Sequence, residues 1–157
     1  MSGPPAIVFR PDDLSGAATQ ALIAAHLAAM HTHSPPESVH ALDVQLLRQP
    51  GITFWTGWIH DELACMGALK RLDSTRGEIK SMRVADIWLG KGVGRAMLDH
   101  IIAEARRMGL TSLWLETGSP EPFRPARRLY ERAGFGYCGP FGDYRLDPMS
   151  VFMTREI

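Results

Sequence analysis

Cysteine and long apolar runs are both scarce in this sequence. Its 157 residues include two cysteines, Cys65 and Cys138, which lie far apart and form no CxxC pair. A disulfide framework or a zinc ribbon requires closely spaced cysteines, so neither is expected. No segment has the roughly 20 apolar residues that span a bilayer, and the opening MSGPPAIVFRPDD lacks the basic start and apolar run of a signal peptide. We therefore expect a cytoplasmic protein in a reducing compartment, with no membrane contact.

An excess of either charge is also absent. Lys plus Arg and Asp plus Glu number 17 each, which argues against a broad electrostatic attraction to nucleic acid or anionic lipid. Apolar residues make up 45% and charged residues 22%, close to the globular average, so a folded chain is expected. The length suits a single domain over residues 1–157 with a real core.

Hydrophobic spacing predicts a mixed α/β fold. Helical spacing over residues 92–108, ended by Gly109, predicts a long helix, whereas the β-branched and aromatic run ITFWTGWI predicts a strand. The other predicted helices are residues 16–30 with Ser15 as cap, 37–47 and 125–133. The other predicted strands are residues 6–9, 63–72, 78–84, 112–116, 134–141 and 150–157. This order indicates a mixed antiparallel and parallel sheet flanked by helices rather than a βαβ repeat.

Three alternating glycines make LGKGVGRAML, residues 89–98, the most informative stretch. Gly90, Gly92 and Gly94 follow a predicted strand and open a predicted helix. Such glycines let the backbone approach a ligand closely, and the helix N-terminus adds partial positive charge, so the turn suits a phosphate or pyrophosphate. Lys91 and Arg95 add to this preference. A plain helix-entry turn would show the same glycines.

Two common phosphate-binding loops do not fit this stretch. A dinucleotide-binding GxGxxG would need glycine at Arg95 or at Met97. A Walker A loop would need GK[ST] at the required spacing, and the sequence lacks it.

The run EIKSMRVADIWLGKGVGRAML instead resembles the acetyl-CoA-binding segment of the GNAT superfamily of N-acetyltransferases, a strand followed by [RQ]xxGxG[AG] at a helix start. The matching residues are Leu89, Gly90, Lys91, Gly92, Val93, Gly94 and Arg95. Leu89 stands where the family usually has Arg or Gln. Because the family holds the pyrophosphate mainly with backbone N–H groups, this departure leaves the site in place.

A second block, FRPARRLYERAGF at residues 123–135, is similar to the family's NxxAxxLYxxxGF. Phe123 replaces the usual Asn, which removes one side-chain hydrogen bond near the cofactor. The order of the blocks and strands agrees with the family over nearly the whole chain, and the tail and HTHSPPESVHALD resemble a subgroup of small bacterial acetyltransferases. The resemblance implies a GNAT-type acyl-CoA N-acyltransferase fold. It also implies that the chain is an enzyme with acetyl-CoA as cosubstrate.

The resemblance further implies direct transfer of the acetyl group to an amine in a ternary complex. Tyr130 matches the family's tyrosine proposed as general acid, and a phenol of pKa about 10 can donate a proton at neutral pH; packing of Tyr130 on the sheet is the alternative. Glu78 matches a carboxylate that acts in the family as a base through water. Glu116 is a second candidate for the base. The alternative for Glu78 is an ordinary carboxylate on the surface. A backbone N–H near Val84 would polarise the carbonyl. The cofactor-binding residues implied are Met82, Arg83, Val84, Leu89, Gly90, Lys91, Gly92, Val93, Gly94, Arg95, Phe123, Ala126 and Tyr130.

The histidine-rich stretch MHTHSPPESVHALD, residues 30–43, admits three interpretations. It contains no i,i+4 histidine pair on one helix and no HExxH, so no native metal is expected. Ser34 or Ser38 could be only a polar helix start. In the family, the connection between the first two helices overhangs the acceptor side of the cleft, and on that resemblance the candidate substrate-binding residues are His33, Glu37, Ser38 and His40.

The acceptor implied is a small-molecule or amino-acid-like amine. Two alternatives are a GNAT module that binds or senses acetyl-CoA without catalysis, and an enzyme that acetylates peptides or proteins. The last strands look exposed, so they could pair with a second chain to form a homodimer. No nucleic-acid partner is expected.

Overall fold

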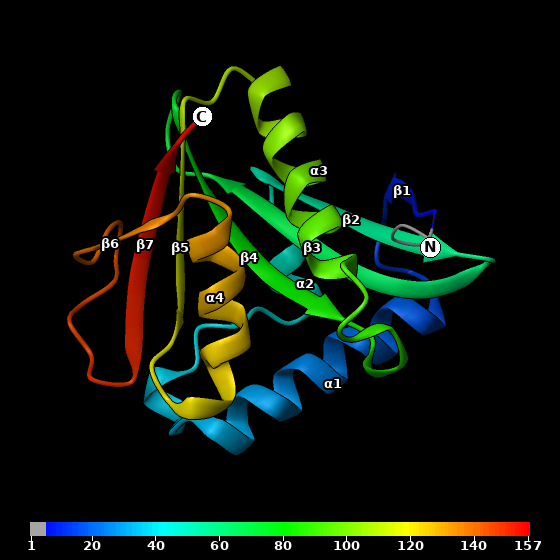
Figure 1. Cartoon of the computed structure of the whole chain (residues 1–157), viewed down its shortest axis with the longest axis horizontal. Coiled ribbons are helices and arrows are strands. Elements are labelled where there is room, and N and C mark those ends of the chain that lie inside the picture. The colour runs from blue at the N-terminus through cyan, green and yellow to red at the C-terminus, as the bar shows by residue number, and fades with distance from the viewer. Residues whose placement is uncertain (1–5) are drawn as a thin grey trace.

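A seven-stranded mixed sheet carries the fold. The computed structural model describes residues 6–157, and Figure 1 shows the sheet with its helices. The strands, in the spatial order β1-β2-β3-β4-β5-β7-β6, are β1 (Val8–Pro11), β2 (Ile52–Ile59), β3 (Glu62–Arg71), β4 (Arg76–Val84), β5 (Ser112–Gly118), β7 (Ser150–Glu156) and β6 (Gly136–Cys138). The helices are α1 (Ala17–His33), α2 (Val44–Leu47), α3 (Val93–Arg107) and α4 (Arg124–Arg132), with 3-10 turns η1 (Pro36–Ser38), η2 (Asp86–Trp88) and η3 (Glu121–Phe123).

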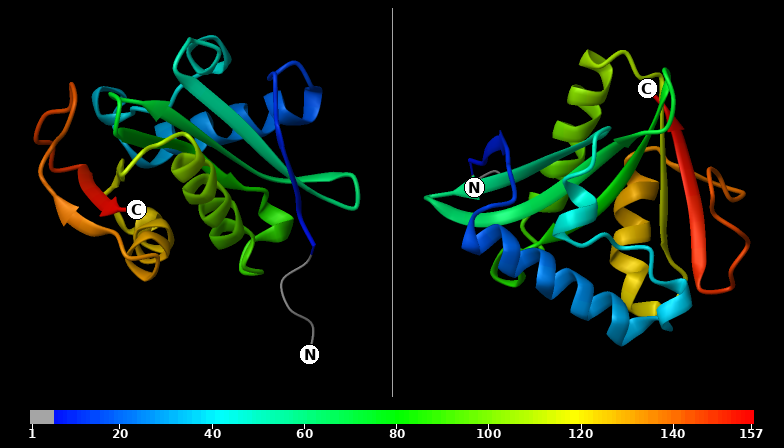
Figure 2. Two further views of the ribbon diagram at one scale, coloured as in Figure 1. Left: turned by 90° about the horizontal axis from the view of Figure 1, so that it is seen from above. Right: turned by 180° about the vertical axis from the view of Figure 1, so that it is seen from behind.

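The helices form two layers around the sheet. Seen from above, α3 and α4 lie on one face and α1 and α2 on the other (Figure 2). Strand β3 is buried on both faces: Leu69 packs in the core under α3, whereas Met66 and Ala68 pack with the α1 residue Ile23. Both apolar layers therefore fix the position of β4, which is the neighbour of β3.

Strands β4 and β5 separate after three paired residues. They are parallel, with Arg76 opposite Ser112, Gly77 opposite Leu113 and Glu78 opposite Trp114. No further pair follows between them, and the two strands diverge visibly in Figure 1. The β3–β4 register is irregular between Met66 and Ala68, near Ser81, whose φ is 56°. The edge of β4 that faces β5 is therefore left without a strand partner from Ile79 onward.

Most of the predicted elements are present, but two expectations in the N-terminal half are wrong. Residues 37–47 do not form one helix; η1 is followed by extended chain and then by α2, which begins where the Asp43 carboxylate accepts the Leu46 N–H at 2.9 Å. Pro35 and Pro36 start the 3-10 turn because proline fits only the first turn of a helix. Ser15 does not cap α1: Gly16 holds that position, and the Ser15 hydroxyl donates to Asp13 instead.

The C-terminal strands also differ from the expectation. The predicted strand 134–141 is reduced to β6, and β7 lies inside the sheet between β5 and β6. Only β6 of the last two strands is at an edge, so the homodimer expected through exposed last strands stays a prediction that now concerns β6. No helix among residues 6–157 is long and apolar enough to cross a membrane. Residues 1–5, part of the segment in which a signal peptide was sought, lie outside the described residues.

Candidate active site

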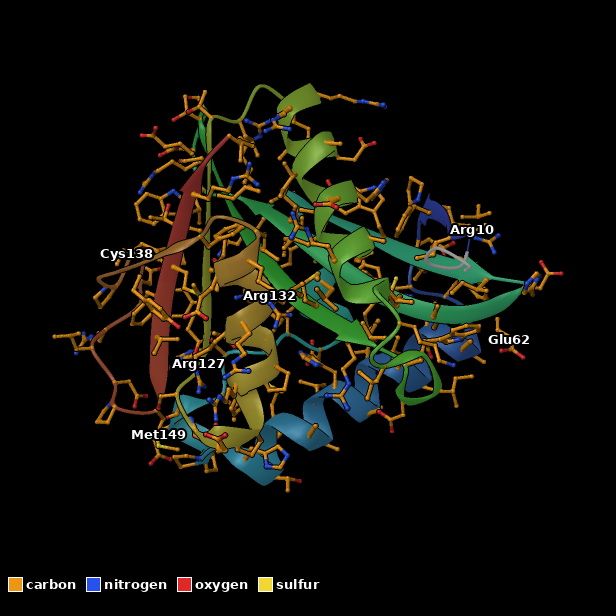
Figure 3. All side chains as sticks on the ribbon, viewed as in Figure 1. Arg10, Glu62, Arg127, Arg132, Cys138 and Met149 are labelled. Carbon is orange, nitrogen blue, oxygen red and sulfur yellow. The ribbon has the colours of Figure 1, made fainter. Side chains whose placement is uncertain are left out.

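A cavity of about 620 Å³ lies where β4 and β5 separate. Its walls come from β4, β5, the turn before α3, helix α4, and the connection between α1 and α2. Arg132 of α4 and Met149, just before β7, both line it, and both are labelled in Figure 3. Of the residues predicted to form the site, the following line this cavity: Ser38, His40, Glu78, Met82, Arg83, Val84, Leu89, Gly90, Gly92, Val93, Gly94, Arg95, Phe123, Ala126 and Tyr130.

Three predicted site residues do not line the cavity. The His33 ring packs edge-on against Phe123, with ring centroids 6.1 Å apart. Glu37 is exposed on η1. The Lys91 ammonium lies over the Trp88 ring, 5.2 Å from its centroid. Phe123 itself faces the cavity and packs so closely on Gly118 that any side chain at position 118 would overlap its ring.

The glycine turn presents free backbone N–H groups to the cavity. Gly92 caps α3 with φ 79° and ψ 5°, a left-handed conformation that glycine adopts without strain. No side chain caps the helix, and the first intrahelical bond runs from Ala96 N–H to the Gly92 carbonyl. Within the described chain, the N–H groups of Val93, Gly94 and Arg95 consequently have no backbone acceptor. With the helix dipole, they form a site for an anion such as a pyrophosphate.

A buried polar network lies at the base of the cavity. The Lys80 ammonium donates to Glu78 Oε2 at 3.1 Å and to the Tyr144 hydroxyl at 2.9 Å, and the Tyr144 hydroxyl donates to the same Glu78 oxygen. Glu78 is only 3% exposed, so the reading of Glu78 as a surface carboxylate is wrong. Burial, with the charge and hydrogen bond of Glu78, raises the pKa of Tyr144 far above its ordinary value. The carboxylate of Glu78 is thus held as half of an ion pair.

Glu116, unlike Glu78, is not part of a described ion pair. It lies on β5 two residues beyond Trp114, at the point where the strands part, and it lines the cavity. Its Oε2 accepts a hydrogen bond from the Ser150 hydroxyl at 2.7 Å. Burial raises the pKa of Glu116 to about 7, the hydrogen bond from Ser150 and the charge of Lys80 oppose that rise, and the charges of Glu78 and Asp147 add to it. A carboxylate with this pKa can accept a proton near neutral pH.

Tyr130 faces the same region from α4. It lines the cavity and is 6% exposed, and its ring meets Phe135 at a centroid distance of 5.8 Å. Burial, with a smaller effect of the Glu116 charge, raises its pKa well above the ordinary value of tyrosine. The phenol therefore stays protonated at neutral pH and is available as a proton donor.

Two loops meet across the far end of the cavity from the glycine turn. The Ser38 hydroxyl donates to Asp147 Oδ2 at 2.6 Å, and the His40 ring contacts the Tyr144 ring edge-on with centroids 5.0 Å apart. Asp147 is fixed because its other oxygen accepts the Met149 N–H at 2.8 Å. These two contacts, Ser38–Asp147 and His40–Tyr144, are called the loop bridge below. Sequence reasoning found Ser38 and His40 but missed Lys80, Tyr144, Asp147 and Ser150.

The buried Glu116 gives a testable dependence of stability on pH. Its folded-state pKa of about 7 exceeds the ordinary 4.5, so the folded carboxyl keeps a proton that the unfolded chain releases. Stability is therefore lost as the pH rises between these two values. Relative to Glu116→Gln, the wild type should lose up to about 3 kcal/mol in free energy of unfolding from pH 4.5 to pH 8. Denaturant unfolding at both pH values measures this loss.

Glu62→Gln is the control for replacing a glutamate with glutamine. Glu62 is the exposed first residue of β3 and lies far from Arg132 and Met149 of the cavity wall (Figure 3). A wild-type to Glu116→Gln difference that does not change with pH would contradict the raised pKa of Glu116.

No group of three or more His, Cys, Asp or Glu side chains in residues 6–157 is placed to hold a metal ion. Cys65 and Cys138 are both free.

The sequence profile of the Acetyltransferase (GNAT) family matches residues 19–135, three quarters of the chain. The chain belongs to this family. It is accordingly an acetyltransferase that uses acetyl-CoA, with the mixed seven-stranded sheet of acyl-CoA N-acyltransferases.

Proteins that are similar to this chain over nearly their whole lengths support the family assignment. The uncharacterized N-acetyltransferase YsnE of Bacillus subtilis is 55% identical over 146 residues, 93% of this chain and 97% of that protein. The uncharacterized N-acetyltransferase YedL of Escherichia coli is 50% identical over 149 residues, 95% of this chain and 94% of that protein. The crystal structure of a candidate acyl-CoA N-acyltransferase from Klebsiella pneumoniae has TM-score 0.78 and 26% identity, covering 96% of this chain and 97% of that one.

A further crystal structure, a GNAT family acetyltransferase from Elizabethkingia anophelis, has acetyl-CoA bound. It matches with TM-score 0.68 and 18% identity over 96% of this chain and 98% of that one. At this identity, the likeness concerns the fold.

Proposed function

We propose that the chain transfers the acetyl group of acetyl-CoA directly to the amine of a small-molecule acceptor in the cytoplasm, in a ternary complex. The observation that carries the proposal is the pairing of Glu116, a carboxylate that can accept a proton near pH 7, with Tyr130, a phenol that stays protonated. Both line one cavity whose other end is the glycine turn. An amine acetyl transfer needs these two proton-transfer groups beside an anchor for the cosubstrate.

Two parts of the cavity wall suit two parts of acetyl-CoA, its pyrophosphate and its pantetheine arm. The free N–H groups at the start of α3 would hold the pyrophosphate, with Arg132 on the facing α4. The unpaired edge of β4 from Met82 to Val84 would hydrogen-bond the pantetheine arm as an added strand does. A backbone N–H near Val84 would then stabilise the negative charge on the carbonyl oxygen during attack.

In the proposed reaction, the neutral amine nitrogen attacks the thioester carbonyl carbon and the C–S bond breaks. The amine loses its proton to Glu116, and Tyr130 donates its proton to the departing thiolate. The acetyl group ends on nitrogen, and free CoA leaves as a thiol. We assign the base to Glu116 rather than to Glu78, the residue favoured from the sequence, because a proton on Glu78 would leave the buried Lys80 ammonium without its counter-charge.

Replacing Tyr130 with Phe should lower kcat at least several-fold while leaving the affinity for acetyl-CoA nearly unchanged, because the phenol acts only on the leaving thiolate. The measurement is thiol release with a confirmed amine acceptor, paired with calorimetry of acetyl-CoA binding. Phe135→Leu is the matched control, since Phe135 contacts the Tyr130 ring but has no acidic proton to donate. An unchanged kcat in Tyr130→Phe would remove the acid role.

The experiment that tests the proposed function itself combines calorimetry with acetyl-CoA and thiol release across an amine library. Binding followed by acetylation of an amine supports transfer. Binding without any release of thiol would instead favour the second reading of the sequence, a module that binds acetyl-CoA without catalysis. The presence of both Glu116 and Tyr130 in the cavity weighs against that reading.

A further inference from the structure

Negative charge predominates around Glu116 at the acceptor end of the cavity. Strand β4 contributes Glu78 and Lys80, which neutralise each other as an ion pair at 3.1 Å. The loop between β6 and β7 contributes Asp147, whose pKa is held low chiefly by the hydrogen bond from Ser38. His40 adds no positive charge at neutral pH, because burial lowers its pKa from 6.5. Among the described residues, no ion pair includes Glu116 or Asp147, and the charge of Lys80, which acts on Glu116 as well, is already paired with Glu78.

The arginines of the cavity lie elsewhere. Arg83 is near Asp86, with their closest charged atoms 4.0 Å apart, on the part of β4 that leads to the glycine turn. Arg95 opens α3, and Arg132 is on α4, at the end assigned to the phosphates. Within residues 6–157, a carboxylate on an acceptor beside Glu116 would therefore meet negative charges and a lysine, Lys80, that is already paired with Glu78.

The loop bridge limits the size of the acceptor. Ser38 belongs to the connection after α1, and Asp147 lies 109 residues later in the β6–β7 loop, yet their side chains are hydrogen-bonded at 2.6 Å. The His40–Tyr144 contact joins the same two segments. A long peptide passing between these segments would have to break both contacts, whereas a small molecule can fit beneath them.

Apolar side chains line much of the cavity. Met30, Val39, Phe123 and Met149 line the cavity around its polar groups. Such a lining binds the apolar body of a ligand, while the few polar groups fix its orientation.

We infer that the acceptor is a small primary amine with an apolar body and no carboxylate beside the amine, bound beneath the loop bridge with its nitrogen at Glu116. The inference rests on the proposed function and narrows its acceptor. The cationic form of the amine is attracted to Glu116 and Asp147; it loses its first proton to water before attack, so that Glu116 is still a carboxylate and takes the second proton as the C–N bond forms. An α-carboxylate would add a third unpaired negative charge and disfavour ionisation of Glu116, which the reaction needs.

The test compares acceptors that differ at one group. Thiol release with saturating acetyl-CoA is measured for tryptamine, tryptophan and tryptophan methyl ester, and for phenethylamine, phenylalanine and phenylalanine methyl ester. Each kcat/KM is expressed per neutral amine, so that the different amine pKa values cancel. The amine and the ester of each set should exceed the free amino acid by at least about tenfold. Equal or higher values for the free amino acids would overturn the acceptor class.

Two variants separate the charge from the bridge. Asp147→Asn should reduce the amine-to-amino-acid ratio about threefold or more, because it removes one of the unpaired negative charges. Ser38→Ala leaves Asp147 charged, so it should keep that ratio while raising kcat/KM for a peptide amide such as Trp-Gly-amide. A peptide amide that the wild type acetylates faster than tryptamine would contradict a small acceptor. An amine-to-amino-acid ratio that Asp147→Asn leaves unchanged would contradict the role of negative charge in excluding a carboxylate.

Failure of this inference is distinct from failure of the proposed function. If calorimetry shows no binding of acetyl-CoA, acetyl transfer itself falls. If acetyl-CoA binds and the free amino acids react best, or if other amines of the library are acetylated and none of these is, the acceptor class alone is overturned.

Discussion

Replacing Glu116 with Gln should lower kcat about 100-fold or more at pH 8, which is the usual contribution of a general base. The variant keeps the size of the side chain and an oxygen that can accept the Ser150 hydrogen bond, but it cannot take a proton from the amine. Because the pKa of Glu116 is raised to about 7, the wild type holds the active carboxylate above that pH and the inactive acid below it. The ratio of wild-type to variant kcat should therefore fall steadily from pH 8 to pH 5. Taking the ratio at each pH cancels the titration of the amine substrate.

Glu78→Gln is the matched control for this experiment. The groups that face Glu116 are Glu78 and Lys80 on β4, Asp147 on the β6–β7 loop, Ser150 on β7 and Tyr130 on α4. Removing the negative charge of Glu78 should lower the pKa of Glu116, so the midpoint of the rate profile should move to lower pH while the rise itself remains. If Glu78→Gln abolishes the rise and Glu116→Gln keeps it, the base is Glu78, as the sequence first indicated.

Local patterns explain why much of the fold was predictable. The limits of α3 follow from its helical spacing and from the glycines at both ends, Gly92 and Gly109, which depend on neighbouring residues alone. The hairpin of β2 and β3 follows in the same way from its β-branched and aromatic runs. The prediction of one helix over residues 37–47 was wrong because it used only their helical apolar spacing. In the structure, extended chain lines the cavity there, and the Ser38 side chain is hydrogen-bonded to a distant loop.

The acceptor end of the site depends on contacts that no local pattern encodes. Tyr144 reaches Glu78 across 66 residues, and Asp147 reaches Ser38 across 109. The segment that carries both, CGPFGDYRLDPM, has no helical or strand periodicity, so nothing in it indicated a side chain aimed at a buried carboxylate. Lys80 was missed for a related reason, since a lysine in a predicted strand is expected to face solvent. Only the tertiary fold shows that its partner is Glu78.

The cofactor end of the site, in contrast, could be predicted from one short continuous segment. A single substitution in that segment can therefore test it. Gly92→Asp should abolish measurable binding of acetyl-CoA. It places a carboxylate at the turn whose free N–H groups are assigned to the pyrophosphate. Two like charges about 4 Å apart near a protein surface repel by about 4 kcal/mol, which corresponds to a loss in affinity of well over 100-fold.

The conformation of Gly92 requires a matched control, because φ is 79° and any side chain there carries some backbone strain. Gly92→Asn is nearly identical in shape to Gly92→Asp and tolerates this conformation equally well, but it is neutral. We expect Asn to weaken binding several-fold and Asp to abolish it, with both variants unfolding at similar temperatures. Calorimetry of acetyl-CoA with the three proteins measures the difference. Equal affinities for the Asn and Asp variants would show that the pyrophosphate does not lie at this turn, and intact binding by a folded Gly92→Asp protein would move the cosubstrate to another part of the cavity.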